Sequence, residues 1–282
     1  MDRELRLVWL YCVIDEVVRS IVGNGRSRSR GTQPRLTDAE VLTLQLWGEM
    51  EGLQGDAAIW RHAMDWWLGW FPHIGSEWNF VRRCANLRGL MDKILVLLFG
   101  PTGDWNAFDG LPLPVCQLVR AMRDMRFKGE AAWGFCAAKD EHYYGFKAGI
   151  SMNSRGEIYR LWLGPANVDE REMVESTAFG MHGLLLADKG LISTILTDLM
   201  HGRGIGLTTP LRKNMSDTRP KWLVQQAMRL RRRIETAFGV LVEHFGIGRT
   251  RGRDFWRWSS RILRKILAYN LLLRFEGIAA LA

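Results

Sequence analysis

The sequence predicts a mixed α/β protein with an all-helical N-terminal part. Up to about residue 99, apolar residues recur at helical spacing. After the turn-forming residues 100–103, short apolar and aromatic runs that suit strands alternate with helical stretches. We therefore expect a helical N-terminal domain, a candidate for DNA binding, over residues 1–100 and an α/β domain over residues 101–282.

The first domain begins with an amphipathic pattern over residues 5–22, which predicts a helix. Thr37 and Glu40 then have the spacing of a capping box, in which each side chain binds the backbone N–H of the other residue. Apolar positions from Val41 to Trp47 continue the helical period, and a helical pattern persists through the tryptophan-rich stretch to Phe99.

The second domain begins with a short strand that ends at Asp109, and Pro112 and Pro114 are expected to break any regular structure directly after it. Residues 142–152 and 158–163 predict a hairpin around a turn at 153–156. Further along the chain we expect a helix starting near Asn167, strands over 184–187 and 204–209, a long helix from Trp222, and a final helix over about 255–275.

The amino-acid composition limits the classes of function that the protein can have. The chain has 282 residues with 47% hydrophobic content, which argues against wholesale disorder. A formal net charge of +9 favours nucleic acid, an anionic membrane surface or another acidic partner. The sequence has no apolar run of the roughly 18 to 20 residues that cross a bilayer, so we expect a soluble, cytoplasmic protein without a membrane partner. A phosphate-binding G-x-x-x-x-G-K-[ST] loop is also absent, so nucleotide hydrolysis is unsupported.

Three carboxylates stand out: Asp109, Asp188 and Glu235. Each aspartate follows a strand-like run, and Glu235 lies beside Ile234 at the margin of the apolar stripe of its helix. Two divalent ions roughly 4 Å apart need carboxylates from separate segments, because neighbouring side chains cannot surround both ions. An acidic trio in a basic protein therefore indicates metal ions that act on a polyanion.

Taken singly, each carboxylate has an ordinary structural interpretation. Asp109 precedes Gly110, as in many turns, and Asp188 suits the cap of a following helix. Glu235 follows Arg231 by four residues, the spacing of a common surface ion pair. Only the combination and order of the three favours a shared site.

The motifs around these carboxylates resemble a known family. They are Phe108-Asp109-Gly110, Tyr143-Tyr144-Gly145-Phe146-Lys147, Gly164-Pro165-Ala166, Leu186-Ala187-Asp188-Lys189-Gly190-Leu191 and Arg231 to Phe238. In this order they look like the catalytic half of bacterial insertion-sequence transposases of the DDE type. The resemblance covers about 105–270, and residues 36–86 are similar to the helical N-terminal part of that family.

This resemblance implies a ribonuclease H-like mixed sheet flanked by helices. Asp109 would lie on the first strand, Asp188 on the fourth and Glu235 on a later helix, and all three would be catalytic residues and metal ligands for two Mg²⁺ (or Mn²⁺) ions. Related transposases often carry a tyrosine, an arginine and a lysine around the glutamate. Arg231 fits the place of the arginine, whereas this chain has Met228 and Val242 at the places of the tyrosine and the lysine. The departures leave the metal ligands intact but change the auxiliary contacts to the DNA end.

The resemblance also implies an activity: metal-dependent cleavage of DNA at transposon ends, followed by strand transfer into target DNA. The expected partners are double-stranded terminal inverted repeats, target DNA and further copies of the chain, as a homodimer or higher oligomer on DNA in the bacterial nucleoid. Two alternatives stay open, a metal-dependent nuclease of the same fold that does not join strands and a non-catalytic DNA-binding protein derived from a transposase.

Basic residues supply the candidate DNA contacts, namely Lys147, Arg231, Arg232, Arg233, Arg251, Arg253 and Arg257. The last three belong to a segment, residues 249–265, in which arginines alternate with Phe255, Trp256 and Trp258. Cationic side chains neutralise phosphates, and aromatic rings stack on bases. A solvated helix face with its tryptophans in the core fits the same pattern.

Overall fold

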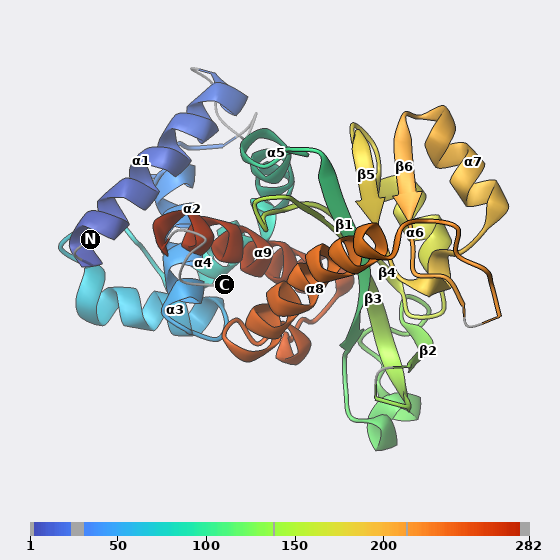
Figure 1. Cartoon of the computed structure of the whole chain (residues 1–282). Coiled ribbons are helices and arrows are strands. Elements are labelled where there is room, and N and C mark those ends of the chain that lie inside the picture. Colours follow the sequence, from blue (N-terminus) through green and yellow to red (C-terminus); the bar gives the residue numbers. More distant parts are fainter. Residues whose placement is uncertain (1–2, 24–30, 138, 213, 277–282) are drawn as a thin grey trace. The chain divides into compact units, whose positions relative to one another are not determined.

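The computed structural model describes residues 3–23, 31–137, 139–212 and 214–276. The chain divides into two compact units (Figure 1). One comprises residues 1–98 and 250–282, and the other comprises residues 99–249. Among the described residues, no helix combines the length and the apolar character that a bilayer crossing requires.

The first unit, which we call the helical unit, is built from helices throughout its described length. Its helices are α1 (Arg3–Val22), α2 (Asp38–Met50), α3 (Asp56–His62), α4 (Glu77–Asn86), α5 (Arg88–Leu98) and α9 (Phe255–Glu276). The predicted capping box at the start of α2 is confirmed, since Thr37 Oγ1 accepts from the Glu40 N–H at 3.1 Å and the Glu40 carboxylate accepts from the Thr37 N–H. Helix α2 lies at the centre of the unit, and Leu42 and Leu44 are fully buried.

Helix α9 differs from its predicted placement, because it packs with the N-terminal helices instead of belonging to the second domain. It contacts α2, α4 and α5, and Trp258 and Ile262 are buried in the core of the helical unit. The physical reason is a long run of apolar side chains on α9 that need a partner surface. Trp258 is thus a core residue, whereas Trp256 is 49% exposed.

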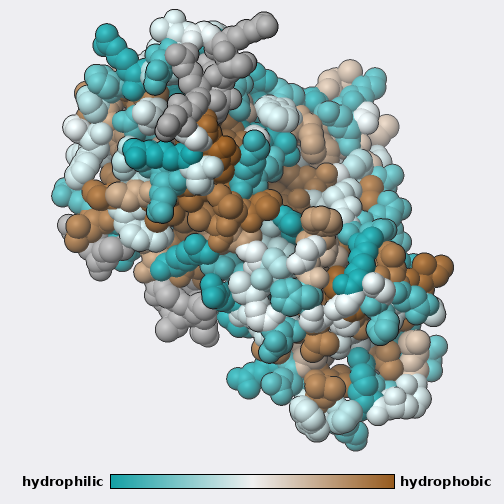
Figure 2. All heavy atoms as spheres, turned by 90° about the horizontal axis from the view of Figure 1, so that it is seen from above, coloured by the Kyte–Doolittle hydropathy of each residue, from teal (hydrophilic) through white to brown (hydrophobic). Residues whose placement is uncertain are grey.

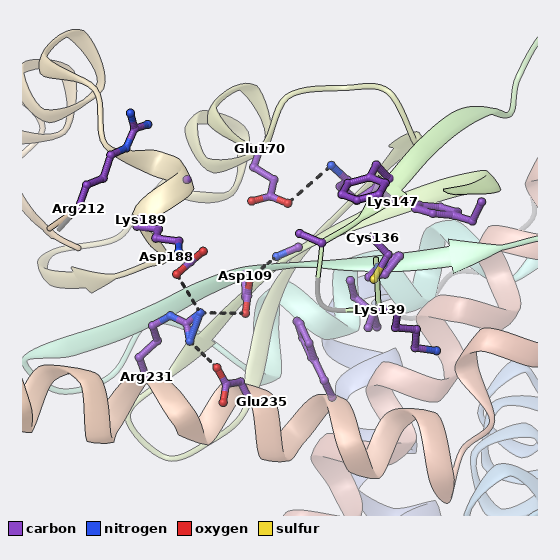
Figure 3. A pocket seen from close by; sticks show the side chains of 18 of the residues that line it. Asp109, Cys136, Lys139, Lys147, Glu170, Asp188, Lys189, Arg212, Arg231 and Glu235 are labelled. Carbon is purple, nitrogen blue, oxygen red and sulfur yellow. Dashed lines mark hydrogen bonds and ion pairs between the residues drawn. The ribbon is translucent and has the colours of Figure 1, made fainter. Parts of the chain in front are cut away.

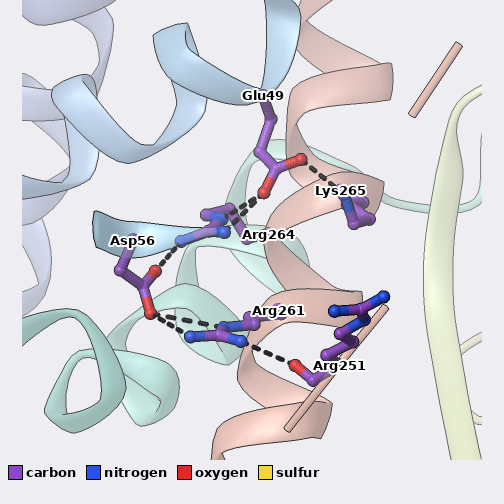
Figure 4. Close-up of polar contacts among 6 residues, drawn as sticks. All are labelled: Glu49, Asp56, Arg251, Arg261, Arg264 and Lys265. Carbon is purple, nitrogen blue, oxygen red and sulfur yellow. Dashed lines mark hydrogen bonds and ion pairs between the residues drawn. The ribbon is translucent and has the colours of Figure 1, made fainter. Parts of the chain in front are cut away.

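Buried charges fix α9 to the helical unit (Figure 4). Arg264, whose side chain is 1% exposed, forms an ion pair with Glu49 at 2.5 Å and another with Asp56. Lys265 contacts the second Glu49 oxygen at 2.6 Å, and Arg261 contacts Asp56 at 2.7 Å. Three members of the predicted basic segment, Arg261, Arg264 and Lys265, therefore neutralise carboxylates of the protein itself.

Two opposing effects set the pKa values in this buried cluster: burial disfavours charged groups, and ion pairing favours them. Burial disfavours the charged form of Asp56, but Arg264 and Arg261 outweigh this effect and lower the pKa of Asp56 below its usual value. For Lys265 burial prevails over the attraction of Glu49, and its pKa is lowered. Such a cluster is costly to break, since removal of one partner leaves an unpaired charge in the interior.

The second unit, which we call the α/β unit, contains one mixed sheet. Its strands are β1 (Trp105–Pro114), β2 (Ala132–Cys136), β3 (Glu141–Asn153), β4 (Ile158–Pro165), β5 (Gly183–Leu186) and β6 (Ile205–Thr208). The order is β2-β3-β1-β5-β6, and β4 also pairs with β3. The predicted hairpin is present as β3 and β4. Two pairs of strands are parallel, β1 with β5 and β5 with β6.

Helices α6 (Glu170–Thr177), α7 (Thr194–Gly202) and α8 (Lys221–Glu243) flank this sheet. Helix α8 packs against β1 and β5, and α6 packs against β3 and β4. The mixed sheet and its helices confirm the predicted ribonuclease H-like fold class. The start of α6 differs by two residues from expectation, because Asp169 and not Asn167 caps the helix by accepting from the Arg171 N–H at 2.9 Å.

Strand β1 is longer than predicted and runs through both prolines to Pro114. It pairs with β3 along Asn106–Pro114 but with β5 only over Trp105–Ala107. Beyond Ala107 the side of β1 toward β5 is therefore unpaired, and a proline that lacks an N–H is tolerated there. Asp109 consequently lies inside β1, at the point where the parallel pairing has ended.

We predict that Arg264→Met lowers the free energy of unfolding by about 3–5 kcal/mol, because it leaves buried carboxylates undercompensated. Chemical denaturation followed by circular dichroism measures this loss. Arg253→Met is the matched control, since Arg253 is exposed in the same unit, and its effect should stay within about 0.5 kcal/mol. Equal effects of the two substitutions would contradict a structural role for the buried cluster.

Candidate catalytic site

The register of two parallel strands places the two aspartates at the same level. Ala107 of β1 lies opposite Leu186, the last residue of β5. Asp109 and Asp188 each follow that pair by two residues, so both side chains emerge beyond the end of the shared ladder. Glu235 comes from α8, which packs against these same two strands. The fold thus brings the three predicted carboxylates together from three separate segments.

The guanidinium of Arg231 lies among these carboxylates (Figure 3). Its Nη2 atom is 3.7 Å from Asp109 Oδ2 and 3.4 Å from Asp188 Oδ1. Its Nη1 atom is 2.5 Å from Glu235 Oε1. The Arg231 side chain is only 14% exposed, so the partners of this predicted DNA contact are the three carboxylates.

Burial differs among the three carboxylates. The side chains of Asp188 and Glu235 are 42% and 53% exposed, whereas that of Asp109 is 20% exposed. Burial raises the pKa of Asp109 to about 6, although Arg231 and the Gly110 N–H oppose the shift. Glu170 and Asp188 add negative charge nearby and also raise it. Burial is thus the main obstacle to ionisation of Asp109, and a cation bound beside it would favour the charged form.

The structure also tests the ordinary interpretations of these residues. Asp109 Oδ1 does accept from the Gly110 N–H at 2.9 Å, but within a strand and not within a turn. Asp188 precedes the 3₁₀ turn Lys189–Leu191 without a side-chain capping hydrogen bond. The Arg231–Glu235 pair exists at the expected spacing, yet the same guanidinium reaches both aspartates. The roles of turn residue, helix cap and surface ion pair therefore do not explain why the three carboxylates meet at one guanidinium.

A fourth carboxylate, Glu170, lines the same pocket. It begins α6, and its Oε1 atom is 3.6 Å from Lys147 Nζ (Figure 3). A Cβ atom on Gly110 would lie 2.7 Å from Glu170 Oε1, so glycine at this position leaves room for the carboxylate. The sequence indicated only a helix N-terminus here, because the acids of residues 169–175 favour that position whatever else they do.

The pocket around these groups has a volume of about 1010 Å³ and carries charges of both signs. Its cationic lining residues are Lys139, Lys147, Lys189, Arg212 and Arg231. Lys147 is mostly buried and donates to the Val168 carbonyl at 3.4 Å. A pocket lined by carboxylates together with lysine and arginine is suited to a phosphate-bearing substrate and its metal ions.

The remaining predicted DNA contacts have different surroundings. Arg232 is exposed on α8. Arg233 donates to the Ser154 carbonyl at 2.9 Å, next to the hairpin turn of β3 and β4. Arg251, Arg253 and Arg257 are exposed in the helical unit, where Arg257 forms an ion pair with Asp254. DNA contacts at these positions remain predictions.

The donor set suits divalent metal ions. Carboxylate oxygens are hard ligands that Mg²⁺ and Mn²⁺ prefer, and the three side chains already converge on one cationic group. Within the described part of the chain, no three His, Cys, Asp or Glu side chains are close enough to hold one ion. Figure 3 gives the reason, since the Arg231 guanidinium lies between the carboxylates. Metal binding therefore requires the guanidinium and the carboxylates to rearrange.

Comparison with known families shows to which family the chain belongs. The family model of the transposase DDE domain matches residues 100–255, more than half of the chain. The chain belongs to this family. Members typically use divalent metal ions, and the match covers all three carboxylates of the site.

A solved structure extends the similarity to the fold. The chain is similar to a piggyBac transposase in a synaptic complex with hairpin DNA, with a TM-score of 0.51 over 96% of this chain and 73% of that chain. Sequence identity is 11%, so this similarity concerns the fold alone. A search of curated proteins finds no match.

We predict that Arg231→Gln tightens Mn²⁺ binding by about fivefold or more, because a unit charge near 4 Å is worth at least ~1 kcal/mol. Isothermal titration calorimetry of the protein without DNA measures the change. Arg232→Gln is the control, since it removes the same charge from an exposed position on the same helix. Unchanged or weaker Mn²⁺ binding by Arg231→Gln would contradict competition between the guanidinium and the metal.

Proposed function

We propose that this transposase-family protein cleaves DNA at the ends of its own element and transfers the new ends into target DNA. The observation that carries the proposal is the convergence of Asp109, Asp188 and Glu235 on a single cationic group. The family match supports a role in transposition, and the basic pocket rim supports a polyanionic substrate. An insertion sequence in a bacterial genome is the proposed source.

In the proposed reaction, Asp109, Asp188 and Glu235 would hold two Mg²⁺ or Mn²⁺ ions. When bound, these ions would activate the attacking hydroxyl and stabilise the leaving oxygen. Arg231 would have to leave its place between the carboxylates to admit them. Lys147 and Lys189 line the pocket and orient the strand by its phosphates.

Both chemical steps exchange one phosphorus–oxygen bond for another. In the first, water attacks the phosphorus at the element end and the bond to the 3′ oxygen breaks, which leaves a 3′-hydroxyl and a 5′-phosphate. In the second, that 3′-hydroxyl attacks a target phosphodiester and displaces the target 3′ oxygen. No covalent bond to the protein is needed, so the contribution of the chain is positioning and charge.

We predict that Asp109→Asn, Asp188→Asn and Glu235→Gln each reduce Mg²⁺-dependent cleavage by at least about 100-fold, because each removes a charged ligand from the metal centre. The assay uses a labelled duplex that carries the terminal repeat of the element. Glu243→Gln is the matched control on α8, since Glu243 is exposed on the same helix outside the pocket. Full activity of any of the three variants would remove that residue from the proposed centre.

Joining distinguishes a transposase from a nuclease of the same fold. We expect a labelled, pre-cleaved end with a free 3′-hydroxyl to become covalently attached to supercoiled target DNA, because the same centre can activate that hydroxyl. Gel electrophoresis under denaturing conditions measures the joined product, and an end with a 3′-deoxy terminus is the control. Cleavage without joining would assign the protein to the nuclease class, and DNA binding without either reaction to the non-catalytic class.

A further inference from the structure

A second groove adjoins the carboxylate pocket in the α/β unit. Its volume is about 560 Å³, and its lining includes Trp133, Phe135, His142 and Lys147. It shares Phe135, Lys147, Glu170 and Gly190 with the pocket that contains the catalytic carboxylates. A substrate that occupies both would place one part on the aromatic side chains and another beside the carboxylates.

Trp133 and Phe135 lie on β2, which stands at one end of the sheet order. Trp133 and Phe135 are two residues apart and therefore point to the same face of the strand. The two residues are 44% and 49% exposed, although aromatic rings stabilise a protein most when they are buried. Scattered hydrophobic residues among hydrophilic ones are ordinary on a protein surface, as in Figure 2. Two neighbouring rings in a groove beside a catalytic pocket are a more specific arrangement.

Cross-strand contacts hold these rings in place but do not cover their faces. Trp133 contacts Tyr144 with ring centroids 5.6 Å apart and planes inclined by 57°. Phe135 contacts His142 at 5.1 Å with an inclination of 55°. Because the partners are tilted and not stacked, a flat group can still lie against the exposed rings.

Polar groups next to the rings suit a phosphate. Lys147 lines both the groove and the pocket. Tyr143 also lines the pocket and is 8% exposed, and its buried hydroxyl has no hydrogen-bond partner among the described residues. A buried donor without a partner is costly unless a ligand supplies an acceptor. The flat apolar rings suit the base of a nucleotide, and the nearby cation and unpaired donor suit its phosphate.

We propose that Trp133 and Phe135 form a stacking site for one unpaired nucleobase of the DNA strand whose phosphate lies at the carboxylates. The base must be unpaired, because neighbouring bases cover both faces of a base inside a duplex. This inference rests on the proposed function, since it takes the carboxylate pocket as the place where a DNA phosphate binds. It adds a base-recognition subsite on the sheet edge.

The test compares two fluorescent single strands of equal length and charge, an oligothymidylate and a chain of abasic nucleotides. Fluorescence anisotropy with the full chain, in EDTA so that no cleavage occurs, measures their affinities. We expect the wild type to prefer oligothymidylate. The double variant Trp133→Ala/Phe135→Ala should lose about fivefold or more of its affinity for oligothymidylate and keep its affinity for the abasic chain. Trp133→Phe should retain most of the preference, because it keeps a ring.

Matched controls in the same unit are Trp222→Ala and Phe179→Ala, whose rings are 64% and 75% exposed outside the groove, and these should change neither affinity. The inference is overturned if the wild type binds both strands equally or if the double variant weakens both alike. It is also overturned if light scattering shows a dimer that the double variant dissolves, since a second copy would then occupy the groove.

Failure of the stacking site and failure of the proposed function give different experimental results. Cleavage by wild type and by Asp188→Asn tests the metal centre, whereas the binding comparison in EDTA does not depend on cleavage. A cleaving enzyme without base preference would refute the stacking site alone. A base-preferring protein without cleavage would refute the catalytic proposal alone.

Discussion

The parallel pairing of β1 with β5 is the constraint on which the site depends. It covers only Trp105–Ala107 on β1, and it ends two residues before Asp109 and Asp188. A register shift of one residue would turn Asp109 or Asp188 to the other face of the sheet. The early end of the ladder also leaves the flank of β1 open from Asp109 onward, which provides the space that the pocket, Arg231 and the prolines of β1 occupy.

The pairing of carboxylates with cationic side chains is the second factor that shapes the structure. The two units differ in how these charges are paired. In the helical unit, Glu49 and Asp56 are paired with Arg264, Lys265 and Arg261, and the result is a closed interior cluster. In the α/β unit one guanidinium serves three carboxylates, and two of these are substantially exposed. The first arrangement stabilises a fold, whereas the second leaves two carboxylates accessible to ligands.

The sequence predicts most of this architecture but not all of its details. Helical periodicity and the Thr37 capping box locate the helices well, since these signals are local. The strand β2 was not predicted, because five residues with a central glycine give a weak pattern, and the length of β1 was obscured by its prolines. The approach of Glu170 to Asp109, the burial of Arg264 and the position of Arg231 depend on tertiary packing. Among these features, a spacing in the sequence indicates only the contact of Arg231 with Glu235.

The division of the chain has a consequence for its synthesis. Residues 99–249 form a continuous stretch, whereas the helical unit needs α9, which lies near the C-terminus. Until α9 leaves the ribosome, Glu49 and Asp56 lack their cationic partners and the apolar surface of α2 lacks its cover. The α/β unit can therefore fold during translation, while the segment translated first completes its fold last.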